Sequence, residues 1–161
     1  MIGIIAAVSS NGVIGVGNSL PFSYKKDMEH FRKTTADSTV IMGRKTFESL
    51  NCKPLPKRRN IIITSSKINQ NEVESFSSMK EAISSCEGST WIIGGHKIYQ
   101  DGMQFADKIV LTITPDIIEG KEVIKFPWIN PLIYKIENSF TRELDKENKL
   151  TIVEYYRYYK I

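Results

Sequence analysis

Short apolar runs rich in Ile and Val recur along the chain, and segments with helical spacing separate them. The apolar runs lie at 2–8, 39–42, 60–64, 90–93 and 108–114. The helical segments lie at 24–35, 44–50, 78–85 and 96–104. β-Branched composition and short length favour buried strands for the runs, whereas apolar positions three and four residues apart favour helices for the segments. Strands that alternate with helices predict an α/β fold built on a largely parallel sheet.

The C-terminal part follows a different pattern. Two β-rich runs, Ile133 to Glu143 and Leu150 to Tyr159, flank the polar segment 145–149. Such a pair predicts a hairpin that adds an antiparallel edge to the sheet. A chain of 161 residues is long enough to bury one core, so we expect a single domain over 1–161.

The predicted helix over 24–35 has a lone acid on its apolar side. Tyr24, Met28, Phe31 and Thr35 recur at helical spacing, and Asp27 lies one turn before Phe31. The dipole stabilises an acid in the first turn of a helix, so a structural role is the simpler interpretation of this pattern alone. A substrate-binding carboxylate is the alternative.

Two predicted strands end in glycine and lead directly into a helix. Thr39-Val-Ile-Met-Gly43 precedes one helix, and Trp91-Ile-Ile-Gly-Gly95 precedes another. Free N–H groups at a helix start favour phosphate, and glycine lets a ligand approach the backbone. Because the carboxyl ends of parallel strands meet at one edge, the two junctions together suit a dinucleotide pyrophosphate.

Cations and hydroxyl groups follow the first junction and a neighbouring strand. Arg44 and Lys45 come directly after Gly43, and Thr64 ends the run at 60–64 with Ser65 directly after it. Cations are unfavourable at a helix N-terminus unless an anion offsets them. No acid is found at these strand ends, where one usually binds an unphosphorylated ribose. The pattern therefore favours NADPH over NADH.

Composition excludes several other classes. The net charge is +4, but the basic residues are scattered, so a small anionic ligand explains them and no nucleic acid is expected. Charged residues follow the first apolar run too soon for a membrane span, and no basic segment precedes it. Cys52 and Cys86 are expected to be free thiols, and neither they nor His30 and His96 have metal-ligand spacing. No metal is expected.

Many of these residues occur in the order and spacing of one family. They include Ile4-Ile-Ala-Ala7, Val13-Ile-Gly15, Leu20-Pro21, Asp27, Phe31, Val40-Ile-Met-Gly-Arg44, Thr46, Leu55-Pro56, Arg58, Asn60 and Ile93-Gly-Gly95 with Tyr99. On these residues the chain resembles dihydrofolate reductase over essentially its whole length. The resemblance implies an NADPH-dependent reduction of 7,8-dihydrofolate to 5,6,7,8-tetrahydrofolate for one-carbon metabolism and thymidylate, purine and glycine synthesis. It also implies a mainly parallel eight-stranded sheet, flanked by helices, with an antiparallel C-terminal hairpin.

The resemblance also implies the substrate site. Asp27 would bind the 2-amino group and adjacent ring nitrogen of the pterin, Thr112 would steady it, and Arg58 would pair with the glutamate α-carboxylate. Burial among Ile5, Met28 and Phe31 would raise the Asp27 pKa. The substrate-binding residues would be Ile5, Ala6, Asp27, Met28, Phe31, Leu50, Arg58, Ile93 and Thr112.

A second implied set of residues binds the cofactor and completes the catalytic site. The catalytic residues would be Asp27, Leu20, Tyr99 and Phe22, with a water rather than Asp27 as the direct proton donor. The Gly94–Gly95 peptide is expected to be cis, and the glycine-rich loop over 9–23 is expected to act as a lid. The cofactor residues would be Ala7, Ile14, Asn18, Gly43, Arg44, Lys45, Thr46, Thr64, Ser65, Gly94, Gly95, Lys97, Ile98 and Tyr99.

Departures from the family pattern and rival functions stay open at this point. Phe22 replaces a tryptophan that is frequent in bacterial members, so the water route does not carry over. Lys26, His30 and an insertion at 51–53 also depart from bacterial relatives, so the antifolate sensitivity does not carry over either. A related reductase of a bicyclic or pyrimidine substrate is one rival, and a basic RNA-binding protein is another. We expect a cytoplasmic monomer whose partners are dihydrofolate and antifolates such as trimethoprim or methotrexate.

Overall fold

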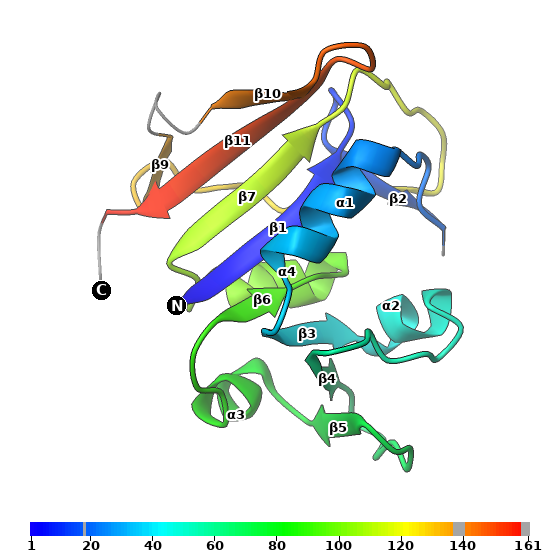
Figure 1. Cartoon of the computed structure of the whole chain (residues 1–161), viewed down its shortest axis with the longest axis vertical. Helices are drawn as coiled ribbons and strands as arrows, with labels where there is room; N and C mark the ends of the chain where they lie inside the picture. The colour runs from blue at the N-terminus through cyan, green and yellow to red at the C-terminus, as the bar shows by residue number, and fades with distance from the viewer. Residues whose placement is uncertain (18, 137–140, 159–161) are drawn as a thin grey trace.

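The computed structural model describes residues 1–17, 19–136 and 141–158, and most of its strands join one sheet. The strands of that sheet are β1 (Ile2–Val8), β3 (Thr39–Gly43), β4 (Arg59–Ile63), β5 (Val73–Phe76), β6 (Thr90–Ile92), β7 (Lys108–Ile113), β9 (Tyr134–Ile136), β10 (Arg142–Asp145) and β11 (Leu150–Arg157). Their order is β10-β11-β7-β1-β6-β3-β4-β5, and β9 also pairs with β11 (Figure 1). All pairs from β7 to β5 are parallel, whereas β11 is antiparallel to β7, β9 and β10.

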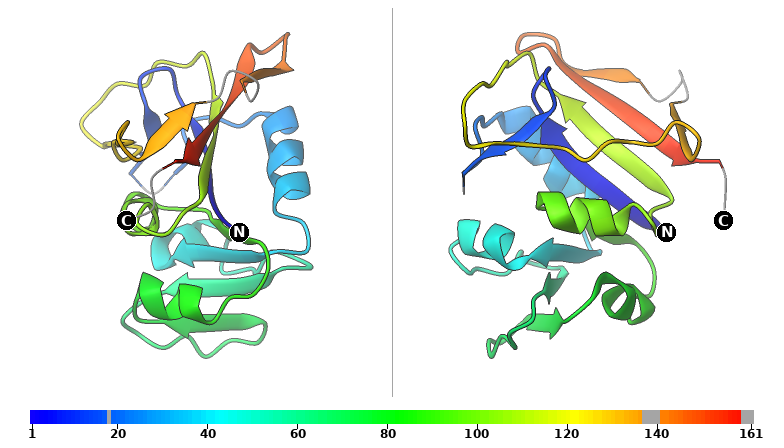
Figure 2. Two further views of the ribbon diagram at one scale, coloured as in Figure 1. Left: turned by 90° about the vertical axis from the view of Figure 1, so that its left-hand side faces the viewer. Right: turned by 180° about the vertical axis from the view of Figure 1, so that it is seen from behind.

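Four helices connect or cover the strands in the described part of the chain. They are α1 (Lys25–Thr34), α2 (Arg44–Ser49), α3 (Met79–Ser84) and α4 (His96–Gly102). α1 and α4 lie on opposite faces of the sheet (Figure 2). This sandwich is the arrangement that parallel strands require, because both of their faces are apolar and must be covered.

Each face of the sheet has its own core. One cluster contains Ile5, Phe47 and Val110, and Phe31 of α1 packs against it. The other contains Ile4, Ile98 and Tyr99, together with residues of α3. Alternating residues of β1 thus enter different clusters, as the two-residue period of a strand requires. The first cluster supports α1, which contains the predicted substrate residues Asp27, Met28 and Phe31, and α2, which ends just before Leu50.

The predicted strands and helices of the α/β part are confirmed to within two residues at each end. Three strands were not predicted: β2 (Val13–Val16), β5 and β8 (Val123–Lys125). β2 and β8 form a separate antiparallel pair. The run from 133 to 143 was predicted as one strand of a hairpin, but it contains β9 and only the start of β10, which extends to Asp145, and these two short strands pair with opposite ends of β11. The middle of that run, 137–140, lies outside the described residues.

Candidate active site

Asp27 lies in the first turn of α1 and faces the sheet. Its side chain is half-buried. Burial raises the Asp27 pKa above its ordinary value of 3.8, while a hydrogen bond from the Thr112 hydroxyl and the nearby His30 act in the opposite direction. Thr112 is buried in β7 opposite Ala7 of β1. The contact between Asp27 and Thr112 that the resemblance implied is therefore present.

The buried side of α1 differs from the predicted one. Met28 was expected to bury Asp27, but its side chain is 53% exposed. Phe31 and Thr35 are less exposed, and Phe31 packs on the core with Leu50 and Ile93. A helix turns by about 100° per residue, so a stripe centred on Asp27 and Phe31 leaves Met28 at its flank. Met28 contributes little to the burial that shifts the Asp27 pKa.

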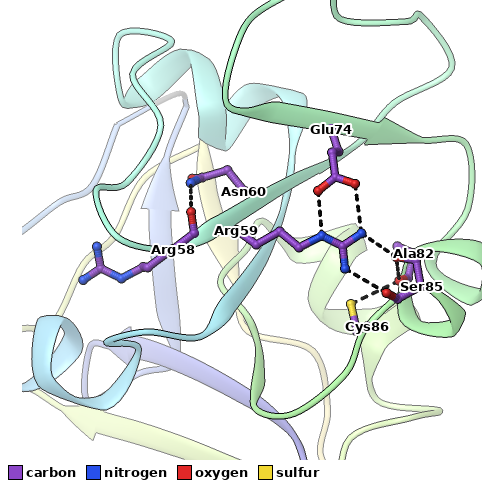
Figure 3. A network of polar contacts seen from close by, with 7 residues as sticks. All are labelled: Arg58, Arg59, Asn60, Glu74, Ala82, Ser85 and Cys86. Carbon is purple, nitrogen blue, oxygen red and sulfur yellow. Dashed lines mark hydrogen bonds and ion pairs between the residues drawn. The ribbon is translucent and has the colours of Figure 1, made fainter.

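Arg58 and Arg59 are sequence neighbours with opposite orientations (Figure 3). Arg59 forms a two-pronged ion pair with Glu74, at 2.6 and 2.9 Å, and donates to the Ser85 carbonyl oxygen at 2.8 Å. It therefore ties β4 to β5 and to the end of α3. The Arg58 side chain points away from this network, as Figure 3 shows.

Neutral acceptors hold the Arg58 guanidinium. It donates to Thr35 Oγ1 at 3.0 Å and to the carbonyl oxygens of Pro56 at 3.0 Å and Arg32 at 3.4 Å. In the described part of the chain it has no ion-pair partner. Burial and the nearby Arg32 lower the Arg58 pKa. A fixed, half-buried guanidinium without a carboxylate partner suits an anionic group of a ligand.

The two glycine junctions lie side by side. β3 and β6 are parallel neighbours, and the Gly43 N–H donates to the Gly94 carbonyl oxygen at 2.8 Å. The Gly94–Gly95 peptide is cis, which confirms the prediction. A Cβ on Gly95 would lie 3.8 Å from Thr46 Oγ1, and one on Gly43 would lie 3.0 Å from Ile98. The N-termini of α2 and α4 are therefore close together, and the residues between them are glycines without side chains.

The predicted phosphate ligands lie at the surface near one junction. Gly43 pairs with Ile63 in register, so Arg44 and Thr64 follow at adjacent strand ends. Lys45 and Ser65 are exposed next to them, and Arg44 donates to Glu48 at 3.2 Å. Cations and hydroxyl groups at this place, beside free backbone N–H groups, fit the 2′-phosphate and pyrophosphate of NADPH. Lys97 lies on α4, where its ammonium is 3.7 Å from Asp101.

Tyr99 joins the ends of two strands below the glycines. Its hydroxyl lies 2.9 Å from the carbonyl oxygens of Ile5 and Ile93 and donates to both. Burial raises the pKa of Tyr99 well above its ordinary value, so the phenol stays neutral. A Cβ on Gly94 would lie 3.2 Å from this hydroxyl. Tyr99 therefore positions the backbone on which the predicted nicotinamide site depends.

The predicted lid is partly ordered by pairing. Within it, β2 pairs with β8, and the Gly17 N–H donates to the Glu122 carbonyl oxygen at 2.9 Å. Ile14 is buried, while Leu20 is 74% exposed. Ala6 is buried, Ala7 and Phe22 are half-buried, and Asn18 lies outside the described residues.

Two contacts at this site were missed by sequence reasoning. The Tyr24 hydroxyl donates to Asp116 Oδ2 at 2.7 Å and thereby joins the start of α1 to the segment after β7. His96 Nδ1 lies 2.7 Å from the Lys125 carbonyl oxygen and joins α4 to β8. Both pairs are far apart in sequence, and no local pattern indicates them. In the described residues no group of three or more His, Cys, Asp or Glu side chains could hold a metal ion.

Comparison with known proteins decides between the reductase and its rivals. A family model described as dihydrofolate reductase matches residues 1–159. The chain belongs to the dihydrofolate reductase family. It is 36% identical to dihydrofolate reductase of Neisseria meningitidis serogroup B over 159 residues, which cover 96% of this chain and 97% of that protein. A dihydrofolate reductase from Enterococcus faecalis, solved with NADP(H) and RAB-propyl, has a TM-score of 0.86 at 28% identity, with 99% of this chain and 97% of that chain covered.

A longer relative matches over part of its length. The bifunctional dihydrofolate reductase-thymidylate synthase of Paramecium tetraurelia is 40% identical over 103 residues, which cover 62% of this chain and 22% of that protein. Membership of the dihydrofolate reductase family makes the chain an NADPH-dependent oxidoreductase that converts dihydrofolate to tetrahydrofolate. The RNA-binding alternative is thereby set aside. No helix among the residues described here is long and apolar enough to cross a membrane.

Proposed function

We propose that Asp27 holds the pterin ring of 7,8-dihydrofolate while NADPH reduces it. The observation that carries this proposal is a half-buried carboxylate that contacts the Thr112 hydroxyl and lies one turn from Phe31. A carboxylate accepts two parallel hydrogen bonds, which match the 2-amino group and the adjacent ring N–H of a pterin. This pairing fixes the ring in one orientation.

Orientation matters because the reaction adds a hydride to a ring carbon and a proton to the adjacent nitrogen. NADPH supplies the hydride when it is bound, and a water supplies the proton. Asp27 would bind the opposite end of the pterin, so it orients the ring and does not hand over the proton directly. Much of the rate enhancement then comes from positioning and from exclusion of bulk water.

Arg58 would bind the α-carboxylate of the substrate glutamate. The neutral acceptors on Thr35, Pro56 and Arg32 fix its guanidinium and leave its charge without a carboxylate in the described residues. Phe31 and Leu50, both half-buried, would flank the aminobenzoyl ring. These groups lie on the same face of the sheet as Asp27, which supports one elongated substrate site.

NADPH would lie over the two glycine junctions. Thr46 and the backbone of Gly43, Gly94 and Gly95 would face the pyrophosphate and nicotinamide, and Arg44 with Thr64 would face the 2′-phosphate. The approach of Gly95 to Thr46 supports this placement, because a side chain at Gly95 would stand beside the Thr46 hydroxyl, whereas Gly43 is required by its close packing on Ile98. We further propose a cytoplasmic monomer that binds antifolates such as trimethoprim or methotrexate and whose Cys52 and Cys86 are free thiols.

One titration tests the substrate assignment. The protein is saturated with NADPH, and absorbance at the nicotinamide band is followed after addition of dihydrofolate, a dihydropteridine without the aminobenzoylglutamate tail, or an aminopyrimidinone. Dihydrofolate should be reduced with the largest kcat/KM. A folded, NADPH-saturated sample that oxidises NADPH faster with the pyrimidinone would refute the proposal in favour of the rival reductase.

A further inference from the structure

His30 lies one turn after Asp27 on the same helix. Both side chains are half-buried on the side of α1 that faces the sheet. His30 Nδ1 lies 3.4 Å from Thr34 Oγ1, whereas Nε2 is buried and has no hydrogen-bond partner among the described residues. Buried polar atoms are nearly always paired in folded proteins, so an unpaired Nε2 next to a substrate carboxylate calls for an explanation.

Charged residues of two strands complete the surroundings of His30. Arg142 of β10 pairs in register with Ile152, and Glu154 of β11 pairs with Val110. Paired residues point to the same face of a sheet, and Ile152 and Val110 belong to the core beneath Phe31. Arg142 and Glu154 therefore rise from the face that α1 covers. The Tyr156 hydroxyl donates to Glu154 Oε2 at 3.0 Å.

We propose that His30, which has Asp27 on one side and Glu154 on the other, is a positioning residue for the substrate-binding carboxylate, and that His30 and Asp27 act as a coupled pair. This proposal rests on the role of Asp27 in pterin binding. An imidazolium in this position would keep Asp27 ionised to lower pH than an isolated buried carboxyl. The enzyme would then retain the form of Asp27 that binds the pterin when the surroundings become acidic.

The electrostatics of the pair agree with this geometry. Burial is the main cause that lowers the His30 pKa and Arg142 lowers it further, while Asp27 and Glu154 raise it. Reciprocally, His30 lowers the pKa of Asp27 against the effect of burial. Lys26, the other basic residue next to Asp27, lies 3.9 Å from Asp145 and is turned toward that acid. Glu154 and Arg142 act on the His30 pKa with opposite signs, and Asp27 is the charge with the largest effect on it, while burial sets the net direction.

Direct titration tests the coupling without enzyme turnover. The chain has two histidines, so His96→Gln assigns the imidazole resonances, and Asp27→Asn assigns the labelled Asp27 carboxyl in carbon NMR. In His30→Gln the Asp27 inflection should move to higher pH by about half a unit or more. In Asp27→Asn the His30 inflection should move to lower pH by the same amount, because coupling between two sites is reciprocal.

Lys33→Gln is the matched control, since it removes a positive charge from the exposed side of the same helix. It should leave both inflections, and the pH profile of kcat/KM for dihydrofolate, unchanged, whereas His30→Gln should move the Asp27 inflection in that profile upward. Independent titration of the two groups, or an equal shift in Lys33→Gln, overturns the proposal. If His30→Gln does not fold, the Asp27→Asn arm decides alone. If the protein lacks reductase activity but shows the reciprocal shifts of the Asp27 and His30 inflections, the proposed function is refuted and the coupling between the two residues still holds.

Discussion

Arg58→Leu tests the anionic end of the substrate site. The variant removes a guanidinium that Thr35, Pro56 and Arg32 hold in one geometry, and it adds no new polar group. A hydrogen bond to a charged group contributes about 1.5–3 kcal/mol, and each 1.4 kcal/mol is about tenfold. The kcat/KM for dihydrofolate should therefore fall about 10-fold to 150-fold. Most of the loss should be in KM, because this contact lies far from the reacting carbon and is equally strong in the ground and transition states.

The assay compares two substrates and one control variant. A dihydropteridine without the glutamate tail cannot use Arg58, so Arg58→Leu and the unaltered enzyme should reduce it equally fast. Lys57→Gln removes a neighbouring exposed charge and should change neither substrate's kinetics. Equal losses for both substrates in Arg58→Leu would show that Arg58 acts through the fold, and an unchanged KM for dihydrofolate would refute its role.

Three further predictions concern stability. Tyr99→Phe leaves the buried Ile5 carbonyl oxygen and the partly buried Ile93 carbonyl oxygen without the hydroxyl donor, so urea unfolding should show a loss of about 1–3 kcal/mol, and an unchanged midpoint would contradict the contact. Gly3→Ala would place a Cβ 2.4 Å from the Trp91 ring, so thermal unfolding should show a cost of about 1–3 kcal/mol, and a full-stability variant would rule out this packing. Because the Asp27 pKa is raised above 3.8, the folded state binds its proton more tightly than the unfolded chain, and stability falls as pH rises from 3.8 through the folded value. Asp27→Asn should therefore unfold at higher urea concentration than the unaltered protein at neutral pH, with no difference below 3.8, and the opposite order at neutral pH would refute the shift.

Local patterns predicted the parallel part of the sheet well, because its strands are apolar on both faces and its helices follow glycine or a polar turn. β1, with the sequence IGIIAAV, is an example. Two of the three strands that were missed, β5 and β8, lack this signal. β5 is VESF and β8 is VIK, and both are short and largely unburied, so their pairing with β4 and β2 defines them. Pairing with a distant strand leaves no trace in a local window.

The candidate site shows the same division. Glycine at two strand ends indicated the proposed phosphate-binding edge, helical spacing singled out Asp27, and the family resemblance supplied the role of Asp27 and the cis Gly94–Gly95 peptide. Sequence spacing could not separate Arg58 from Arg59, because the difference lies in Glu74 and Ser85, which bind only the second arginine. Sequence spacing also placed Met28 in the buried stripe of α1, because an apolar residue at helical spacing was assumed to be buried.

The pH dependence of dihydrofolate reduction by Asp27→Asn tests the central claim most directly. The variant should fold and bind NADPH like the unaltered enzyme, because Asp27 lies on α1 and away from the glycine junctions. Its rate of dihydrofolate-dependent NADPH oxidation should be sharply reduced near neutral pH and should partly recover at low pH, where substrate that is already protonated does not need the carboxylate. A folded, NADPH-binding Asp27→Asn variant with the unaltered rate at neutral pH would contradict the role of Asp27.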